Sequence, residues 1–91
     1  MLRGSVTALK VTILVSPLCD SSLEAAKLLR RFCEERGLEY EEVSVRTMEG
    51  QKIALQAGVK LLPALLIDGK LVHQGPISEE VLRRIVGQAE G

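Results

Sequence analysis

The chain has 91 residues, of which 46% are hydrophobic and 26% are charged, a composition typical of a globular domain. Twelve basic side chains balance twelve acidic ones, and the chain has one Phe, one Tyr and no Trp. This balance argues against binding to nucleic acid, which needs basic patches and stacking side chains, and against binding to anionic membranes. No apolar run approaches the length of a bilayer span, so no membrane contact is expected.

The length and the cysteine content narrow the class of protein further. A chain of this length suits one domain, so residues 1–91 are expected to fold as a single unit. Two cysteines are too few for a disulfide scaffold. The N-terminal residues do not lead into a signal-peptide core, because Lys10 and Thr12 interrupt it. A cytoplasmic protein is therefore expected.

The first predicted element is a short strand from Val11 to Val15. Its residues are mostly apolar and β-branched, which is typical of a strand that is buried on both faces. Pro17 cannot continue a central strand and marks its end. The residues that precede the strand, 1–6, are predicted to be a loose start.

A helix is predicted to follow this strand. Ser21 and Glu24 have the spacing of a capping box, with Ser21 as the cap. The helix should run to about Arg36, because Gly37 is a natural C-terminal stop. Four apolar residues at helical spacing are predicted to face the sheet: Leu28, Leu29, Phe32 and Cys33.

The middle of the chain alternates between strand and helix patterns. Apolar residues alternate from Leu38 to Val45, which predicts a second strand. Residues 46–50 are polar and are predicted to be a connection, and residues 51–57 a short helix that Gly58 stops. Asp68 and Gly69 lie between two apolar runs, which predicts a hairpin of residues 64–67 and 70–73.

Ser78 is predicted to cap the last helix, whose apolar stripe is formed by Val81, Leu82, Ile85 and Val86. The order is then strand, helix, strand, helix, strand, strand, helix. The first strand–helix–strand unit implies a parallel pair with a right-handed crossover, and the hairpin adds two antiparallel strands. We therefore predict an α/β fold with a four-stranded mixed sheet and three flanking helices.

Cys19 lies in the turn between the first strand and the first helix. Helix N-termini carry partial positive charge and unpaired N–H groups, and both favour a thiolate over a thiol. This position therefore favours a reactive cysteine.

Three segments of the chain together resemble the thioredoxin fold, and within it the small glutaredoxin-like thioredoxins. Ser-Pro-Leu-Cys-Asp-Ser-Ser at 16–22 resembles the Ser-Pro-x-Cys-x-x-Cys active-site turn of that family. The stretch at 57–64 resembles its Gly-Val-x-x-x-Pro segment, and the stretch at 67–75 its hairpin and following glycine. The resemblance extends from Val11 to Val86.

The resemblance implies a function and a set of site residues. Cys19 would be a nucleophile in thiol–disulfide exchange, acting on a protein or small molecule that carries a thiol or a disulfide. The Leu62–Pro63 bond would be cis, with Pro63 packed close to Cys19. Leu62 and Pro63 would then bind substrate, because the backbone before the proline can pair with an extended partner segment.

The chain departs from the family pattern where the second cysteine would stand, because that position is Ser22. Dithiol exchange needs a second sulfur to resolve the mixed disulfide. Cys33 lies fourteen residues beyond Cys19, which is roughly 20 Å along a helix, whereas a disulfide needs Cα atoms within about 7 Å. Cys19 would thus act as a monothiol oxidoreductase, with Ser22 either a hydroxyl donor to the thiolate or an ordinary first-turn serine.

Two further departures bear on the chemistry. Asp20 places a carboxylate beside Cys19, and a like charge opposes the effect of the helix terminus on the thiolate. Cys-Asp-Ser-Ser and the stretch at 73–78 also lack the glutathione-binding residues of cluster-binding monothiol glutaredoxins. No cofactor is therefore expected, and no metal site, because His73 has no second ligand nearby.

A second class of function is compatible with the same residues. The chain could be a redox-inactive binding or adaptor module that uses the groove beside the cis-proline. In that case Cys19 would be an inert remnant with an unshifted pKa. Cys33 is expected to be a buried small hydrophobe in either class. The pKa of Cys19 is the property that separates the two classes.

Overall fold

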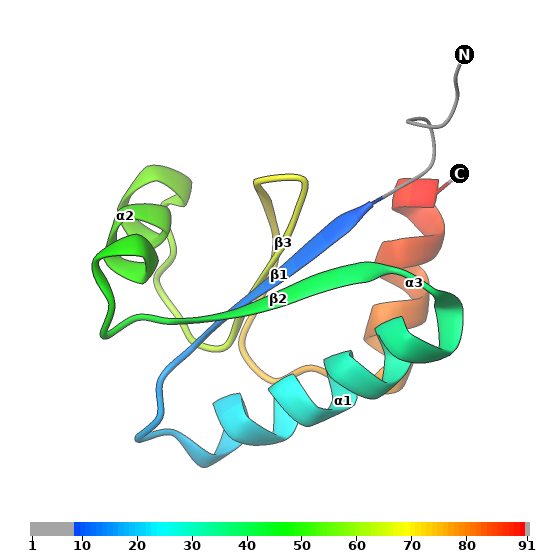
Figure 1. Ribbon diagram of the computed structural model, residues 1–91, viewed down its shortest axis with the longest axis horizontal. Helices are drawn as coiled ribbons and strands as arrows, with labels where there is room; N and C mark the ends of the chain where they lie inside the picture. Colours follow the sequence, from blue (N-terminus) through cyan, green and yellow to red (C-terminus); the bar gives the residue numbers. More distant parts are fainter. Residues whose placement is uncertain (1–8, 91) are drawn as a thin grey trace.

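The computed structural model of the protein describes residues 9–90, so the predicted loose start at residues 1–6 lies outside them. Four strands and three helices follow one another in the predicted order (Figure 1). They are β1 (Lys10–Val15), α1 (Asp20–Arg36), β2 (Glu39–Ser44), α2 (Met48–Ala57), β3 (Ala64–Ile67), β4 (Lys70–Gln74) and α3 (Glu79–Glu90).

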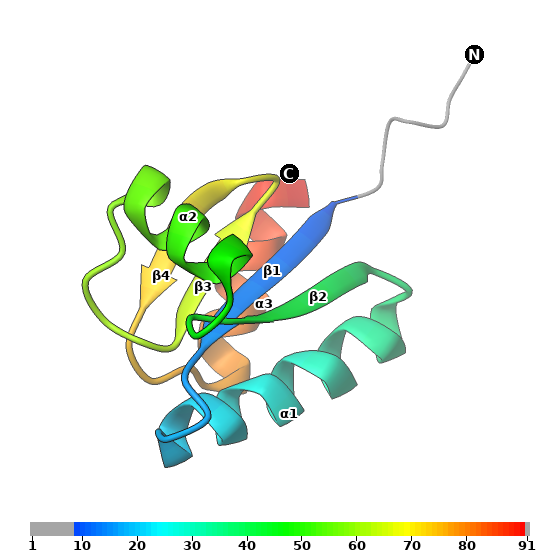
Figure 2. The same cartoon turned by 60° about the vertical axis from the view of Figure 1, so that its left-hand side comes forward.

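The sheet is mixed and has the order β2-β1-β3-β4. β1 pairs in parallel with β2 and antiparallel with β3, and β4 completes the hairpin with β3. Helices α1 and α3 cover one face of the sheet and α2 covers the other (Figures 1 and 2). The predicted four-stranded mixed sheet with three flanking helices is confirmed.

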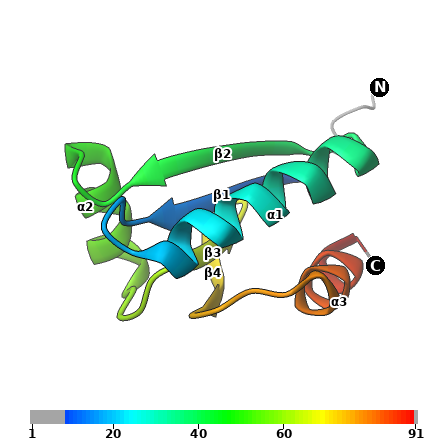
Figure 3. The ribbon, with the colours of Figure 1, turned by 90° about the horizontal axis from the view of Figure 1, so that it is seen from below.

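The core has two layers because β1 is buried on both faces from Val11 to Val15. Val11, Ile13 and Val15 pack against α1 and α3, while Leu14 packs on the α2 side. Seen from below, α1 and α3 lie side by side under the sheet (Figure 3). No helix within residues 9–90 combines the length and the apolar character needed to cross a bilayer.

The predicted capping box at the start of α1 is wrong. The N-cap is Cys19, which has an extended backbone and whose side chain caps no N–H group. Its carbonyl accepts the first helical hydrogen bonds, from the N–H groups of Ser22 and Leu23 at 3.1 and 3.2 Å. Ser21 is therefore the second residue of the helix rather than its cap. At the other end Gly37 takes the left-handed conformation with φ 69°, as predicted.

Helix α2 begins at Met48, three residues before the predicted start. Thr47 caps it, because its hydroxyl accepts a hydrogen bond from the Gly50 N–H at 2.9 Å. Gly50 lies in the first turn, and a Cβ built on it would stand 2.0 Å from the Ser44 carbonyl oxygen. This glycine, predicted to belong to a connection, is what allows the helix to pack against the end of β2.

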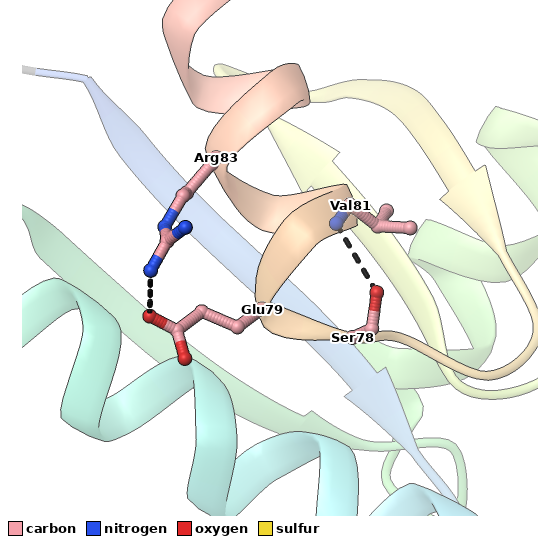
Figure 4. A network of polar contacts seen from close by, with 4 residues as sticks. All are labelled: Ser78, Glu79, Val81 and Arg83. Carbon is pink, nitrogen blue, oxygen red and sulfur yellow. Dashed lines mark hydrogen bonds and ion pairs between the residues drawn. The ribbon is translucent and has the colours of Figure 1, made fainter.

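The hairpin and the last helix match the prediction. Asp68 and Gly69 both have positive φ, 51° and 85°, as a two-residue hairpin turn of this type requires. The Ser78 hydroxyl accepts a hydrogen bond from the Val81 N–H at 3.2 Å and so caps α3 (Figure 4). One turn on, Arg83 forms an ion pair with Glu79 at 2.7 Å (Figure 4).

We predict that Gly50→Ala lowers the free energy of unfolding by about 2 kcal/mol or more, because the added methyl group would collide with backbone atoms of Ser44. Gly87→Ala is the matched control in helix α3, where a Cβ meets nothing within 4 Å. It should raise the free energy of unfolding by about 1 kcal/mol, because alanine is the better helix former. Denaturant unfolding of both variants measures this, and an unchanged stability in Gly50→Ala would contradict the packing described.

Candidate functional site

Four residues singled out from the sequence lie at one end of the sheet. Ala64, the first residue of β3, pairs with Leu14, so the preceding Pro63 lies beside the C-terminal end of β1. The turn that carries Cys19 and Ser22 leaves β1 at this same end, as all three ribbon views show (Figures 1 to 3). The peptide bond between Leu62 and Pro63 is cis.

Cys19 is partly exposed, and its thiol has a hydroxyl partner. Its Sγ lies 3.1 Å from the Oγ of Ser21. This hydrogen bond is the largest of the effects that lower the pKa of Cys19 from 9.0 to about 7. The Ser22 hydroxyl and the backbone N–H groups of Ser22 and Ser21 add to it, and partial burial opposes it. Cys19 is thus about half thiolate at pH 7, far more than a thiol at its ordinary pKa of 9.0 would be.

Asp20 does not prevent this activation. Its side chain is exposed, at the first position of α1. The leading contributions to the pKa of Cys19 come from Ser21 and Ser22 instead. Of the two opposing effects, the carboxylate of Asp20 and the helix start, the helix start prevails and the thiolate is favoured.

Ser22 lies behind Cys19 in the interior of the protein. It is fully buried, and within the described residues its hydroxyl makes no hydrogen bond of ordinary geometry. The hydroxyl nevertheless favours the thiolate of Cys19 through its proximity. A buried hydroxyl without a hydrogen-bond partner lowers the stability of the fold by roughly 1–3 kcal/mol. A serine at this position is therefore unfavourable while the Cys19 thiol is neutral.

Cys33 belongs to the core and not to this site. It is fully buried between α1 and the sheet, and burial raises the pKa of its thiol to about 11. Its position confirms the interpretation as a small hydrophobe. Only Cys19 among the described residues therefore offers a reactive thiol.

The segment before Pro63 is fixed by β4. The side-chain oxygen of Gln74 accepts hydrogen bonds from the N–H groups of Lys60 and Leu61 at 2.6 and 3.0 Å. The Pro63 carbonyl accepts one from the Gly75 N–H at 2.8 Å. Neither backbone group of Leu62 is hydrogen-bonded to another part of residues 9–90. An extended chain could pair with these free groups.

Two large apolar side chains flank the site. Leu18 is 85% exposed directly before Cys19, and Leu61 is 61% exposed two residues before Pro63. Within residues 9–90 no group of three or more His, Cys, Asp or Glu side chains could hold a metal ion. His73 instead makes a hydrogen bond from its Nε2 to the carbonyl of Pro76 at 3.0 Å.

Comparison with known proteins decides the family. The family model described as thioredoxin domain matches residues 9–87. This chain belongs to the thioredoxin domain family. A curated relative from Archaeoglobus fulgidus, named "Probable Thioredoxin", is 32% identical over 79 residues, which are 87% of each chain. Membership supports a general role in thiol–disulfide redox chemistry, since thioredoxins act on protein disulfides.

Solved thioredoxin structures share the fold at low sequence identity. A mutant thioredoxin from Halobacterium salinarum is 18% identical with a TM-score of 0.76, over 93% of this chain and 77% of the other. The thioredoxin of Fasciola hepatica is 21% identical with a TM-score of 0.68, over 92% of this chain and 82% of the other. At these identities the likeness shows the fold alone.

Two residues shape the site of this thioredoxin domain although the sequence pattern gives them no role in it. The pattern assigns Ser21 to a helix cap, although a hydroxyl two positions after a turn cysteine could also indicate a partner for the thiol. Gln74 lies at the end of a strand, where a polar residue is common. Its proximity to Lys60 depends on the hairpin folding back across the sheet, which no local pattern reveals.

We predict that Ser21→Ala raises the pKa of Cys19 from about 7 toward 9.0, because it removes the hydroxyl 3.1 Å from the sulfur. At pH 7 the rate of alkylation of Cys19 should fall roughly five- to tenfold with the loss of thiolate. Iodoacetamide alkylation followed across pH measures both quantities. In Ser22→Ala the pKa should rise less, and a larger rise there would contradict the assignment of Ser21 as the main partner.

We predict that Gln74→Ala lowers the free energy of unfolding by about 1–2 kcal/mol, because two backbone N–H groups lose their acceptor. Gln74→Glu is the matched control, since its carboxylate keeps an acceptor oxygen at the same reach. Denaturant unfolding compares the two variants. Equal losses in both would show that the hydrogen bonds of Gln74 do not fix this segment.

Proposed function

We propose that this thioredoxin domain is a thiol–disulfide exchange protein that acts through the single nucleophile Cys19. The observation that supports this best is a thiol with a pKa of about 7 at a helix N-cap, in a chain whose other cysteine is buried in the core. An inert remnant would have an unshifted pKa. The pKa therefore favours exchange chemistry over the adaptor module.

In the first step the Cys19 thiolate attacks one sulfur of a partner disulfide. A bond forms between Cys19 and that sulfur, the partner's S–S bond breaks, and the second partner sulfur leaves as a thiolate. Ser22 cannot continue the cycle, because a hydroxyl does not attack a disulfide. Two external thiols complete it: they release the partner as a thiol, restore Cys19 and leave as a disulfide.

Leu62 and Pro63 bind the partner in this proposal. Pro63 lies beside the C-terminal end of β1, and the turn with Cys19 begins at that same end. The free N–H and C=O of Leu62 would pair with an extended partner segment, as an added strand does. The exposed side chains of Leu18 and Leu61 would cover its apolar residues.

The proposal needs no cofactor or metal, because the sulfur atoms carry all the electrons. It does need an external thiol. We therefore propose a cytoplasmic location, since thiols are kept reduced in that compartment.

The exposed leucines also support a second candidate, a binding module that recognises the same segment without exchange chemistry. Leu18 and Leu61 offer an apolar surface whether or not Cys19 reacts. Cys19→Ser separates the two functions. Under the exchange proposal the unmodified protein holds its partner through a covalent bond that survives denaturant, and the variant does not. Under the binding proposal neither protein forms that bond, and both hold the partner equally without it.

The decisive experiment is Ser22→Cys. Residues three apart on a helix face the same side, so the introduced sulfur would lie close enough to bridge Cys19. The variant should form an intramolecular disulfide on oxidation and gain catalytic disulfide reductase activity. The unmodified protein should form a mixed disulfide but not turn over with a dithiol-specific reductase. Mass after oxidation and insulin reduction measure these outcomes.

Cys33→Ala is the control for this experiment. It should leave mixed-disulfide formation and the gain in Ser22→Cys unchanged, with some loss of stability from the vacated core position. If the unmodified protein turned over as a dithiol enzyme, or lost activity in Cys33→Ala, the roles given to the two cysteines would be wrong.

A further inference from the structure

An open groove begins beside the reactive cysteine and runs along α1. Its volume is about 410 Å³, and its first residue is Ser21, whose hydroxyl contacts the Cys19 sulfur. One wall is a stripe of α1, and the other is the loop between β4 and α3. The loop lies alongside the first turns of α1 in the view from below (Figure 3). The lining residues beyond Ser21 are Glu24, Ala25, Lys27, Leu28, Arg31, Pro76 and Ile77.

The groove has an apolar floor and a basic far end. Leu28 and Ile77 are half-buried and pack on the core, so their remaining surface faces the groove. Lys27 and Arg31 are exposed on α1 at helical spacing, farther from Cys19 than Glu24 is. None of these three side chains takes part in an ion pair within residues 9–90. Among the lining residues, the cations therefore lie toward the end away from Cys19.

We infer that this groove binds the disulfide-bearing partner protein through an extended segment that carries acidic residues at a fixed distance from its reactive cysteine. The inference rests on the proposed function, because Cys19 must first be the point of attachment. Charge complementarity to Lys27 and Arg31 selects the acidic residues, and the apolar floor covers the side chains between them and the cysteine. The protein then discriminates between partners along α1, at a site separate from the segment before Pro63.

The length of the groove sets the spacing. Along α1, Lys27 and Arg31 lie six and ten residues beyond Ser21, roughly 9 and 15 Å at 1.5 Å per residue. An extended chain rises about 3.3 Å per residue. The acidic residues should therefore stand about three to five positions from the partner's cysteine, and an acidic residue adjacent to that cysteine should be too near to reach the cations.

The probes are synthetic peptides whose cysteine is linked by a disulfide to 5-thio-2-nitrobenzoate. The Cys19 thiolate attacks the peptide sulfur, a Cys19–peptide disulfide forms, and the coloured thionitrobenzoate leaves with the electron pair. One peptide carries two glutamates three and five residues from the cysteine, a second carries glutamines there, and a third carries the glutamates next to the cysteine. Each peptide is made in two versions, with the test residues either N-terminal or C-terminal to the cysteine.

For the unmodified protein, the peptide with distant glutamates should react about three- to tenfold faster than the other two at low salt, with the difference lost at high salt. Lys27→Glu with Arg31→Glu should abolish or reverse this preference. Lys52→Glu with Lys70→Glu makes the same change in net charge at exposed residues outside the groove and should keep it.

Equal rates for the three peptides, or equal loss of preference in both double variants, would overturn the groove as a specificity site. Reaction with all peptides at one rate would still support Cys19 as the nucleophile. Failure to release thionitrobenzoate from any peptide would instead overturn the proposed function together with this inference. The two ideas thus fail in different ways.

Discussion

The pairing of β1 on both of its edges is the constraint on which the rest of the structure depends. Its parallel partner β2 returns through α1, and its antiparallel partner β3 begins at Ala64, directly after Pro63. Because β1 is also buried on both faces, its end cannot shift without disturbing both layers of the core. The turn with Cys19 and the segment with Leu62 are therefore held at one edge by the most constrained strand of the sheet.

The chemistry of the site depends on two neighbouring serines that differ in burial and in hydrogen bonding. Ser21 is exposed and donates to the thiolate, whereas Ser22 is buried and has no hydrogen-bond partner within residues 9–90. A hydroxyl can stabilise a thiolate but cannot exchange with a disulfide. The turn thus has the means to activate its cysteine and lacks the means to release what the cysteine captures, which assigns release to a molecule from solution.

The parts of the fold that the sequence predicts are those with a strong local cause. Asp68-Gly69 requires positive φ at two positions, and Ser78 has a hydroxyl at the right place for a cap, so both are predictable. The start of α1 is not, because Ser21 is a better cap than Cys19 by local preference, and the tertiary turn places the helix start earlier. The first turn of α2 is not predicted because it contains Gly50. Glycine usually indicates a helix end or a loop, whereas here it is needed for close packing.

The candidate site divides in the same way. Cys19 and the Leu62–Pro63 segment follow from the motif and its spacing, whereas Gln74 acts across fourteen residues of chain on Lys60 and depends on the folded hairpin. The pKa of Cys19 is undecided from the sequence, because the effects of Asp20 and of the helix start have opposite signs. The contacts of Sγ in the folded turn resolve it, and the Ser21 hydroxyl at 3.1 Å is the largest of them.

The hydrogen bond from Ser21 has a consequence for the lifetime of whatever Cys19 binds. A thiolate with a pKa of about 7 is stabilised when it departs as well as when it attacks, and thiols of low pKa are the better leaving groups. When an ordinary thiol attacks the partner's sulfur in the Cys19–partner disulfide, the Cys19 thiolate is therefore displaced readily. The same contact that speeds capture makes the captured state short-lived in a thiol-rich environment, so the protein is suited to passing a partner on rather than storing it.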